Sequence, residues 1–244
     1  MNKEEDNNIG VDILAFGAHP DDVEFGCGGL LIKASRAGQR TAIIDLTRAE
    51  LSTNGDIITR QAEAEAAGKI IGVTERKNLE MEDGFVFNSK ENQKRIVEVI
   101  RKYRPRMVLF PYFSDRHPDH ENTGRLIKQA LFLSGLKKFV TNYEPYRPSY
   151  TLMYMMWNEF VPSVVFDIER EWEDKKKAMF VYKSQFVFRA GSEKTIDNKG
   201  DAERFAEARA RGYGFYINAQ FGEPYLSAYP IGFDKLFDFK PNNF

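Results

Sequence analysis

Three short stretches of the chain are almost entirely apolar and rich in β-branched residues, namely residues 11–17, 41–46 and 107–111. Runs of this length with so few polar positions are typical of parallel strands that are buried on both faces of a sheet. A weaker pattern of the same kind covers residues 77–81. These segments predict the central strands of one sheet.

Segments with apolar residues at helical spacing follow these strands. Residues 23–37 stop at Gly38, residues 58–71 stop at Gly72, residues 90–103 stop before Pro105, and a fourth segment covers residues 122–133. Glycine and proline at these places are typical signals for the end of a helix. The alternation predicts βαβ units, and therefore an α/β fold of the Rossmann-like, three-layer α/β/α kind with a mostly parallel sheet.

The pattern changes after about residue 140, where aromatic residues and prolines become frequent. Residues 150–156 and 164–168 are strand-like, and residues 170–182 and 202–213 are helix-like. The polar, glycine-containing residues 188–200 between the two helices predict a mobile loop near a site. Because no linker separates this part from the rest, we expect residues 1–244 to form a single domain, with residues 1–9 flexible.

Composition narrows the classes of function. The 35 basic and 36 acidic residues leave a formal net charge of -1, so no summed field favours nucleic acid or an anionic membrane, and a small-molecule substrate is favoured. Cys27 is the only cysteine, which excludes an intrachain disulfide and a four-thiolate zinc site. With a polar start and no apolar run that could span a bilayer, the chain is expected to be cytoplasmic.

The chain has only three histidines, and all of them directly follow predicted strands. His19 lies in Ala18-His19-Pro20-Asp21-Asp22, and the other two lie in Asp115-Arg116-His117-Pro118-Asp119-His120. Because parallel strands end at the same edge of a sheet, these two loops are expected to meet there. Two imidazoles and one carboxylate, with a position left for water, form a catalytic zinc site.

Each motif by itself is also typical of a turn with a helix-capping aspartate. Packing alone, however, gives no reason for all three histidines to follow strands with a proline and an aspartate beside them. Taken together, the two motifs favour a metal site.

The two motifs resemble those of the LmbE-like (PIG-L) family of zinc-dependent N-acetylglucosamine deacetylases. Further matching segments occur in order along the chain: Gly26-Cys27-Gly28-Gly29, Asp45-Leu46-Thr47, Arg60 with Glu63, Asp83-Gly84, Pro111-Tyr112, Lys175 with Tyr182-Lys183-Ser184-Gln185, and Gly222-Glu223-Pro224. The set is most similar to the bacillithiol-biosynthesis branch, the N-acetylglucosaminyl-malate deacetylases. One departure is Ala49-Glu50-Leu51-Ser52-Thr53-Asn54-Gly55, where that branch often has Gly-Glu-Leu-Gly-Thr-Arg-Gly. Relatives with Ser and Asn there belong to the broader diacetylchitobiose-active group.

The resemblance implies an amide hydrolase with one Zn²⁺ per chain that removes an N-acetyl group from an N-acetylglucosamine conjugate. It assigns the metal ligands to His19, Asp22 and His120. Asp21 would be the general base, and His117, as an imidazolium, would stabilise the oxyanion. Asp119 would hold His117 charged and oriented, and it is equally suited to cap a helix beginning near residue 122.

Three further residues are candidates for substrate binding. Arg60 and Arg116 could contact sugar hydroxyls or a carboxylate of the aglycone, since a guanidinium offers a planar fork of donors. The alternatives are an exposed helix position for Arg60 and an ion pair with Asp115 for Arg116. Tyr182 could line a sugar pocket, although most of the neighbouring aromatic residues are expected in the core.

The sequence leaves other functions open. The substrate could be N-acetylglucosaminyl malate or another conjugate such as diacetylchitobiose. A phosphoesterase holding two metals and a sugar-binding protein without catalysis are the alternatives from other classes. The resemblance also implies a homo-oligomer, either a trimer or a hexamer.

Overall fold

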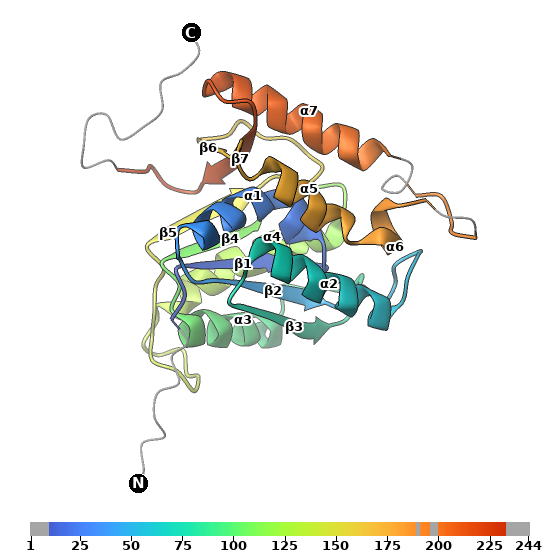
Figure 1. Ribbon diagram of the computed structural model, residues 1–244. Helices are drawn as coiled ribbons and strands as arrows, with labels where there is room; N and C mark the ends of the chain where they lie inside the picture. Colours follow the sequence, from blue (N-terminus) through green and yellow to red (C-terminus); the bar gives the residue numbers. More distant parts are fainter. Residues whose placement is uncertain (1–9, 189–190, 196–199, 233–244) are drawn as a thin grey trace.

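The structure is a computed structural model, and it describes residues 10–188, 191–195 and 200–232. Residues 1–9, which the sequence predicts to be flexible, lie outside the described residues, as does part of the predicted loop 188–200. Figure 1 shows one sheet with helices on both of its faces. This arrangement confirms the predicted three-layer α/β/α fold.

The sheet has seven strands in the order β3-β2-β1-β4-β5-β7-β6. They are β1 (Ile13–Gly17), β2 (Thr41–Thr47), β3 (Glu75–Met81), β4 (Met107–Pro111), β5 (Tyr150–Tyr154), β6 (Val164–Asp167) and β7 (Gly222–Ser227). The first five strands are parallel, whereas β7 runs antiparallel to both β5 and β6. The strand order reverses between β1 and β4, and the carboxyl ends at such a switch point form the usual ligand crevice of α/β sheets.

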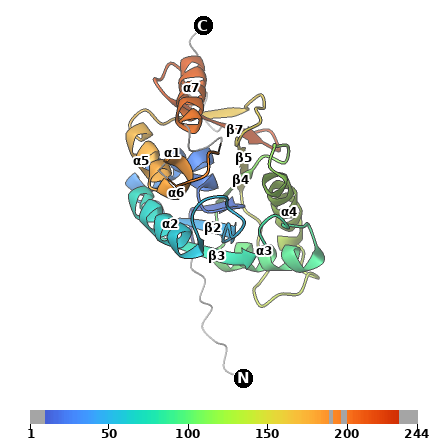
Figure 2. The ribbon, with the colours of Figure 1, turned by 90° about the vertical axis from the view of Figure 1, so that its right-hand side faces the viewer.

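The helices are α1 (Asp22–Arg36), α2 (Ile57–Ile71), α3 (Lys90–Tyr103), α4 (Pro118–Ser134), α5 (Trp172–Phe180), α6 (Lys183–Phe186) and α7 (Asp201–Tyr216). Successive side chains of β1 point to opposite faces of the sheet. Ile13 and Ala15 join the core beneath α1, α5 and α7, whereas Leu14 and Phe16 join the core beneath α3 and α4. Figure 2 shows these two helical layers on either side of the strands. Burial on both faces explains why β1, β2 and β4 are almost continuously apolar.

Several elements differ from the sequence-based expectations. The helix expected at residues 170–182 ends at Phe180 and is followed by the short α6, and β7 was not expected at all. Helix α4 begins at Pro118 rather than near residue 122. It starts earlier because the side chain of His117 accepts a hydrogen bond from the backbone N–H of Asp119, which makes His117 the N-cap.

Helix α1 is bent at Cys27, whose φ of -143° is not helical. Just after the bend, the backbone N–H groups of Gly29 and Leu30 donate to the carboxylate of Glu223 at 2.9 Å and 2.7 Å. Lys175 forms a buried ion pair with the same carboxylate. Glu223, from the last strand of the sheet, therefore caps the second half of the first helix.

Among the described residues, none of the helices combines the length and the apolar character needed to cross a bilayer.

Candidate metal centre and active site

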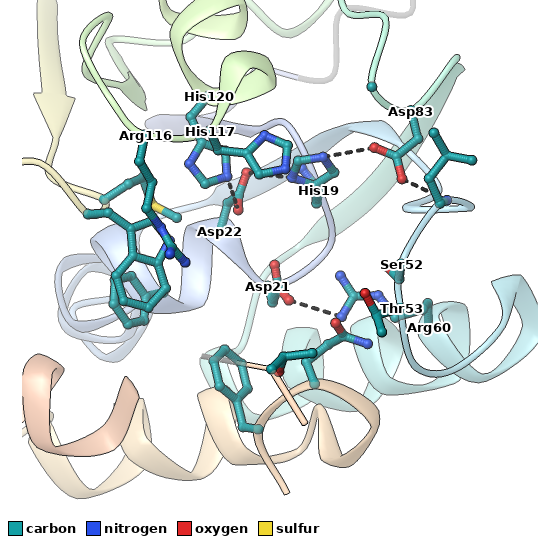
Figure 3. A pocket seen from close by; sticks show the side chains of 18 residues that line it. His19, Asp21, Asp22, Ser52, Thr53, Arg60, Asp83, Arg116, His117 and His120 are labelled. Carbon is teal, nitrogen blue, oxygen red and sulfur yellow. Dashed lines mark hydrogen bonds and ion pairs between the residues drawn. The ribbon is translucent and has the colours of Figure 1, made fainter. Parts of the chain in front are cut away.

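The two histidine-containing loops meet at the carboxyl ends of β1 and β4, as the sequence predicts. The rings of His19 and His120 have their centroids 5.5 Å apart, and those of His117 and His120 are 4.7 Å apart. Figure 3 shows all three imidazoles together above Asp22. Parallel topology brings residues that are about a hundred positions apart in the sequence to one place.

His19, Asp22 and His120 are buried, and one ligand atom from each lies within 4.8 Å of the others. Asp22 Oδ1 is 3.2 Å from His120 Nε2, and Asp22 Oδ2 is 3.7 Å from His19 Nδ1. The backbone N–H groups of Ala18 and His19 donate to Asp22 Oδ2, which fixes this carboxylate in the turn after β1. The predicted ligand set is thus assembled by the fold.

His19 and His120, the two candidate metal-binding histidines, each have a carboxylate on the ring nitrogen that faces away from Asp22. Asp115 Oδ1 lies 2.9 Å from His120 Nδ1, and Asp83 Oδ1 lies 3.0 Å from His19 Nε2. This arrangement leaves His120 Nε2 and His19 Nδ1 facing Asp22. Carboxylates in this position commonly fix the tautomer and the orientation of metal-binding imidazoles.

The donor set fits a zinc ion on chemical grounds. Two imidazoles and one carboxylate match the three protein ligands of catalytic zinc sites. Burial lowers the pKa of His120, but Asp22 and Asp115 outweigh it and raise the pKa to about 9. Buried carboxylates therefore surround these imidazoles with negative charge, which a bound cation would balance.

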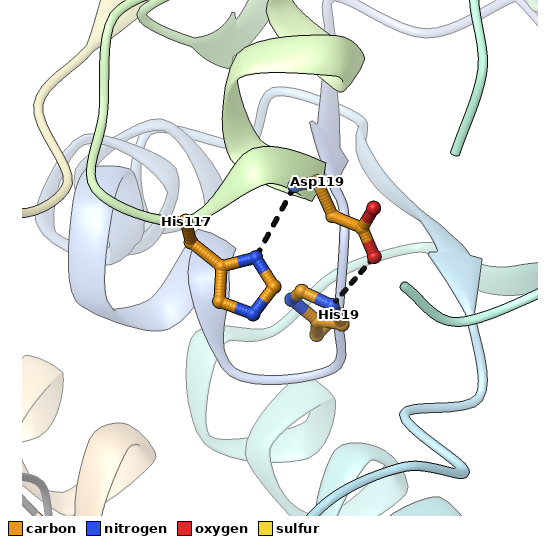
Figure 4. Close-up of side chains that lie close together, drawn as sticks. All are labelled: His19, His117 and Asp119. Atoms are coloured by element: carbon orange, nitrogen blue, oxygen red, sulfur yellow. Dashed lines mark hydrogen bonds and ion pairs between the residues drawn. The ribbon is translucent and has the colours of Figure 1, made fainter. Parts of the chain in front are cut away.

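Asp119 occupies a different position from the one expected. The backbone N–H of Asp119 donates a hydrogen bond to His117 Nδ1 at 3.2 Å, whereas the Asp119 carboxylate points elsewhere. The carboxylate accepts from the backbone N–H groups of Gly84 and Val86 and lies 3.4 Å from His19 Nε2 (Figure 4). Asp119 therefore supports His19 and the loop after β3, and it lies inside the first turn of α4 rather than capping it.

The geometry of His117 argues against the expected imidazolium. Because Nδ1 accepts a backbone hydrogen bond, the proton of the neutral ring is on Nε2. Burial and the neighbouring His19 and His120 lower the pKa of His117. The ring lies exposed in the lining of the pocket, where Nε2–H can donate to a ligand.

Asp21 lies beside the candidate ligand Asp22 in an unusual backbone conformation, with a φ of 121°. Residues other than glycine hold such angles only at a cost of about 1–3 kcal/mol, and they do so mostly at functional sites. Burial raises the pKa of Asp21 to about 6, although Arg60 lowers it. A carboxylate with this pKa is suited to exchanging protons near neutral pH.

Arg60 binds Asp21 and Pro20. Its Nη1 donates to Asp21 Oδ2 at 2.9 Å, and its Nη2 donates to the carbonyl oxygen of Pro20. The side chain is only 2% exposed, so it is not the exposed helix residue that we considered as the alternative. The guanidinium holds the carboxylate of Asp21 while lining the same pocket.

The two remaining candidates differ in position. Arg116 lines the pocket, and its guanidinium carbon lies 4.0 Å from the centroid of the Trp157 ring. Tyr182 is fully buried and donates to Glu24 Oε1 at 3.0 Å. Tyr182 contacts the site through Arg60, which lies over its ring, and not from the pocket lining.

The pocket over these residues is a cavity of about 380 Å³. Asp83 belongs to this site, although it was not among the candidate residues from the sequence. It follows β3, the strand with the weakest sequence pattern, and its only signal was the Asp83-Gly84 pair in the resemblance.

Known proteins resemble this chain in sequence. Residues 14–131 match the model of the family described as GlcNAc-PI de-N-acetylase (PIG-L). Over 189 residues the chain is 29% identical to the diacetylchitobiose deacetylase of Thermococcus kodakarensis, covering 71% of this chain and 70% of that protein.

Solved structures resemble the fold over most of its length. A conserved protein from Thermus thermophilus has a TM-score of 0.85 and 33% identity, covering 93% of this chain and 98% of that chain. The N,N'-diacetylchitobiose deacetylase from Pyrococcus horikoshii has a TM-score of 0.79 and 25% identity, covering 93% of this chain and 87% of that chain.

Proposed function

The family-model match and these relatives support membership of the PIG-L/LmbE-like deacetylase family, and on that premise we propose that the chain is a zinc-dependent N-deacetylase of amino sugars. One observation carries the proposal. His19, Asp22 and His120 present ligand atoms to one point, and the carboxylate of Asp21 stands beside them without being part of that set. A metal site with a free carboxylate next to it has the parts that amide hydrolysis needs.

Zinc bound to these ligands would supply a Lewis acid that activates water and polarises the acetyl carbonyl. Asp21 takes a proton from the attacking water and gives it to the sugar nitrogen as the C–N bond breaks, so that acetate and a free amine are released. Arg60 holds the Asp21 carboxylate in place during both transfers.

His117 has a separate role in this proposal. Its Nε2–H donates a hydrogen bond to the acetyl oxygen, where negative charge develops when water adds to the carbonyl carbon. A neutral ring performs this role, because the hydrogen bond from the Asp119 N–H to Nδ1 is kept throughout. Asp119 and Asp83 hold His19, and Asp115 holds His120.

Two conjugates of N-acetylglucosamine are candidates for the natural substrate. Diacetylchitobiose is favoured by the named activities of the Thermococcus and Pyrococcus relatives. The sequence motifs favour N-acetylglucosaminyl malate, and Arg116 at the pocket would be the partner of its carboxylates. Assembly into trimers or hexamers and a cytoplasmic location are further parts of the proposal.

Acetate release from three compounds tests the function. N-acetylglucosamine, diacetylchitobiose and N-acetylglucosaminyl malate are compared with the zinc-loaded protein, the chelator-treated protein and the chelated protein after zinc is restored. We expect one zinc per chain, loss of turnover on chelation, recovery with zinc, and a preference that identifies the aglycone. Turnover that survives complete metal removal contradicts the proposal. Sugar binding without acetate release would favour the binding protein, and two metals with hydrolysis of phosphate esters would favour the phosphoesterase.

A further inference from the structure

Part of the pocket is built by three segments that are far apart in the sequence. The lining includes Thr53 in the loop after β2, Gln185 in α6, and Thr195 in the segment 191–195. Figure 3 shows Thr53 on the same side of the pocket as Arg60. Hydroxyl and amide groups without charge suit the recognition of sugar hydroxyls.

Asn54 joins two of these segments through a reciprocal pair of hydrogen bonds. Its Nδ2 donates to the carbonyl oxygen of Glu193 at 3.0 Å, and its Oδ1 accepts from the backbone N–H of Glu193 at 2.9 Å. A side-chain amide imitates a peptide group and can pair in both directions. An arginine at this position, as the bacillithiol-branch pattern often has, could donate but not accept.

The loop that carries Asn54 is itself fixed to the body of the protein. Gln185 Nε2 donates to the carbonyl oxygen of Asn54 at 2.7 Å. Ser184 is held in turn by Glu63, which accepts from its backbone N–H at 2.8 Å and from its hydroxyl at 2.6 Å. Gly55 has a φ of +81°, and a Cβ on it would lie 2.9 Å from the Ser184 side chain. Asn54 is therefore a well-supported anchor for segment 191–195.

We propose that Asn54 is a positioning residue for substrate binding: by clamping the backbone at Glu193, it places Thr195 against Thr53 and Gln185 and so completes the polar part of the pocket. The proposal rests on the proposed deacetylase function for its substrate. The proposal concerns substrate binding and not the chemical step. Among the described residues, none of the hydrogen bonds of Asn54 goes to Asp21 or to a proposed metal ligand.

The kinetic test uses zinc-loaded protein and diacetylchitobiose. We expect Asn54→Ala to raise KM about tenfold, because it removes the two hydrogen bonds that order segment 191–195. The kcat should change less than about twofold. Thr195→Val, which keeps the side-chain shape without the hydroxyl, is expected to raise KM as well. In the double variant the two effects are expected to be less than additive, because Asn54 acts through Thr195. Asn88→Ala is the matched control. Asn88 is exposed, and among the described residues its side chain forms hydrogen bonds only with Gln129 and Gln93.

A second measurement does not need catalysis. Hydrogen exchange at the Glu193 amide is expected to be faster in Asn54→Ala than in the wild type or in Asn88→Ala. Unchanged exchange overturns the clamp, whatever the activity. Faster exchange with unchanged KM, with additive effects, or with a loss confined to kcat overturns the role in substrate binding. If the wild type releases no acetate from any of the sugars, the proposed function fails, and exchange at Glu193 in the same samples still decides the clamp.

Discussion

The carboxylate of Asp21 is joined to the guanidinium of Arg60 at 2.9 Å, and it is held there from a backbone conformation that few residues other than glycine adopt. The arrangement places a partly buried carboxylate next to the candidate metal ligand Asp22, outside the candidate ligand set itself. The chemical roles of these two residues can be separated by substitution.

Asn in place of Asp21 keeps the size of the side chain but removes its capacity to accept a proton. We expect Asp21→Asn to lower kcat by a factor of about 100 to 10,000, the usual contribution of a general base, while one zinc per chain is retained. Acetate release and elemental analysis measure the two quantities. Glu65→Gln, an equivalent change at an exposed position of α2, should leave both unchanged. Loss of zinc together with activity would instead make Asp21 a ligand.

Arg60 distinguishes positioning of the base from contact with the sugar. Because the guanidinium donates hydrogen bonds to Asp21 and to the carbonyl oxygen of Pro20, we expect Arg60→Gln to lower kcat about tenfold, with a smaller effect on KM. Arg60→Lys should lie between this variant and the wild type, since an ammonium keeps the charge but not the fork. A raised KM with unchanged kcat would favour the direct sugar contact that the sequence suggested.

Asp115 is expected to control the affinity for the metal without touching it. Asp115→Asn weakens the hydrogen bond to His120 Nδ1, and we expect zinc affinity to fall by about 10- to 100-fold. Competition with a chelating dye measures the change. Asp12→Asn, at the opposite end of the β1 strand, serves as the control. Equal affinities in the two variants would show that Asp115 does not orient His120.

Gly26 shows a steric requirement within α1. A Cβ at this position would lie 2.2 Å from the ring of Tyr154, which is fully buried and donates to the carbonyl oxygen of Phe16. We expect Gly26→Ala to destabilise the protein by about 1–3 kcal/mol in denaturant unfolding.

Gly212 is the matched control for this substitution. It also lies within a helix, α7, but a Cβ there meets nothing within 4 Å. Gly212→Ala is therefore expected to be neutral or to stabilise by up to about 1 kcal/mol, the normal helix preference for alanine. Similar effects of the two substitutions would contradict the steric explanation.

The sequence predicted that the two histidine-containing loops meet at one end of the sheet, for a physical reason. Buried parallel strands are recognisable as apolar runs, and such strands align their carboxyl ends, so residues that directly follow them can be placed together. His19 and His120 were located in this way. The strand β7 was missed because Pro224 within it is unusual for a strand that is paired on both sides.

Side-chain orientation could not be obtained from the sequence. Nothing in the pattern of α2 indicates that Arg60 points inward to Asp21. The carboxylate of Asp119 turns to the loop after β3 because Gly84 and Val86 offer backbone N–H groups, and this depends on how distant strands pack. Tyr182 likewise finds its hydrogen-bond partner, Glu24, through the packing of α5 and α6 against α1 and α2.

The cap on α1 is supplied by Glu223, a residue that the ribosome adds long after α1 itself. Every residue to which we assign a chemical role precedes residue 121. The bend of α1 at Cys27, however, is stabilised by β7, which begins more than a hundred residues after His120. A nascent chain still lacking β7 would have its zinc ligands but leave the N–H groups of Gly29 and Leu30 without this carboxylate. We therefore expect stalled chains ending before residue 222 to be cut by protease within α1, whereas chains that include β7 should resist cleavage there.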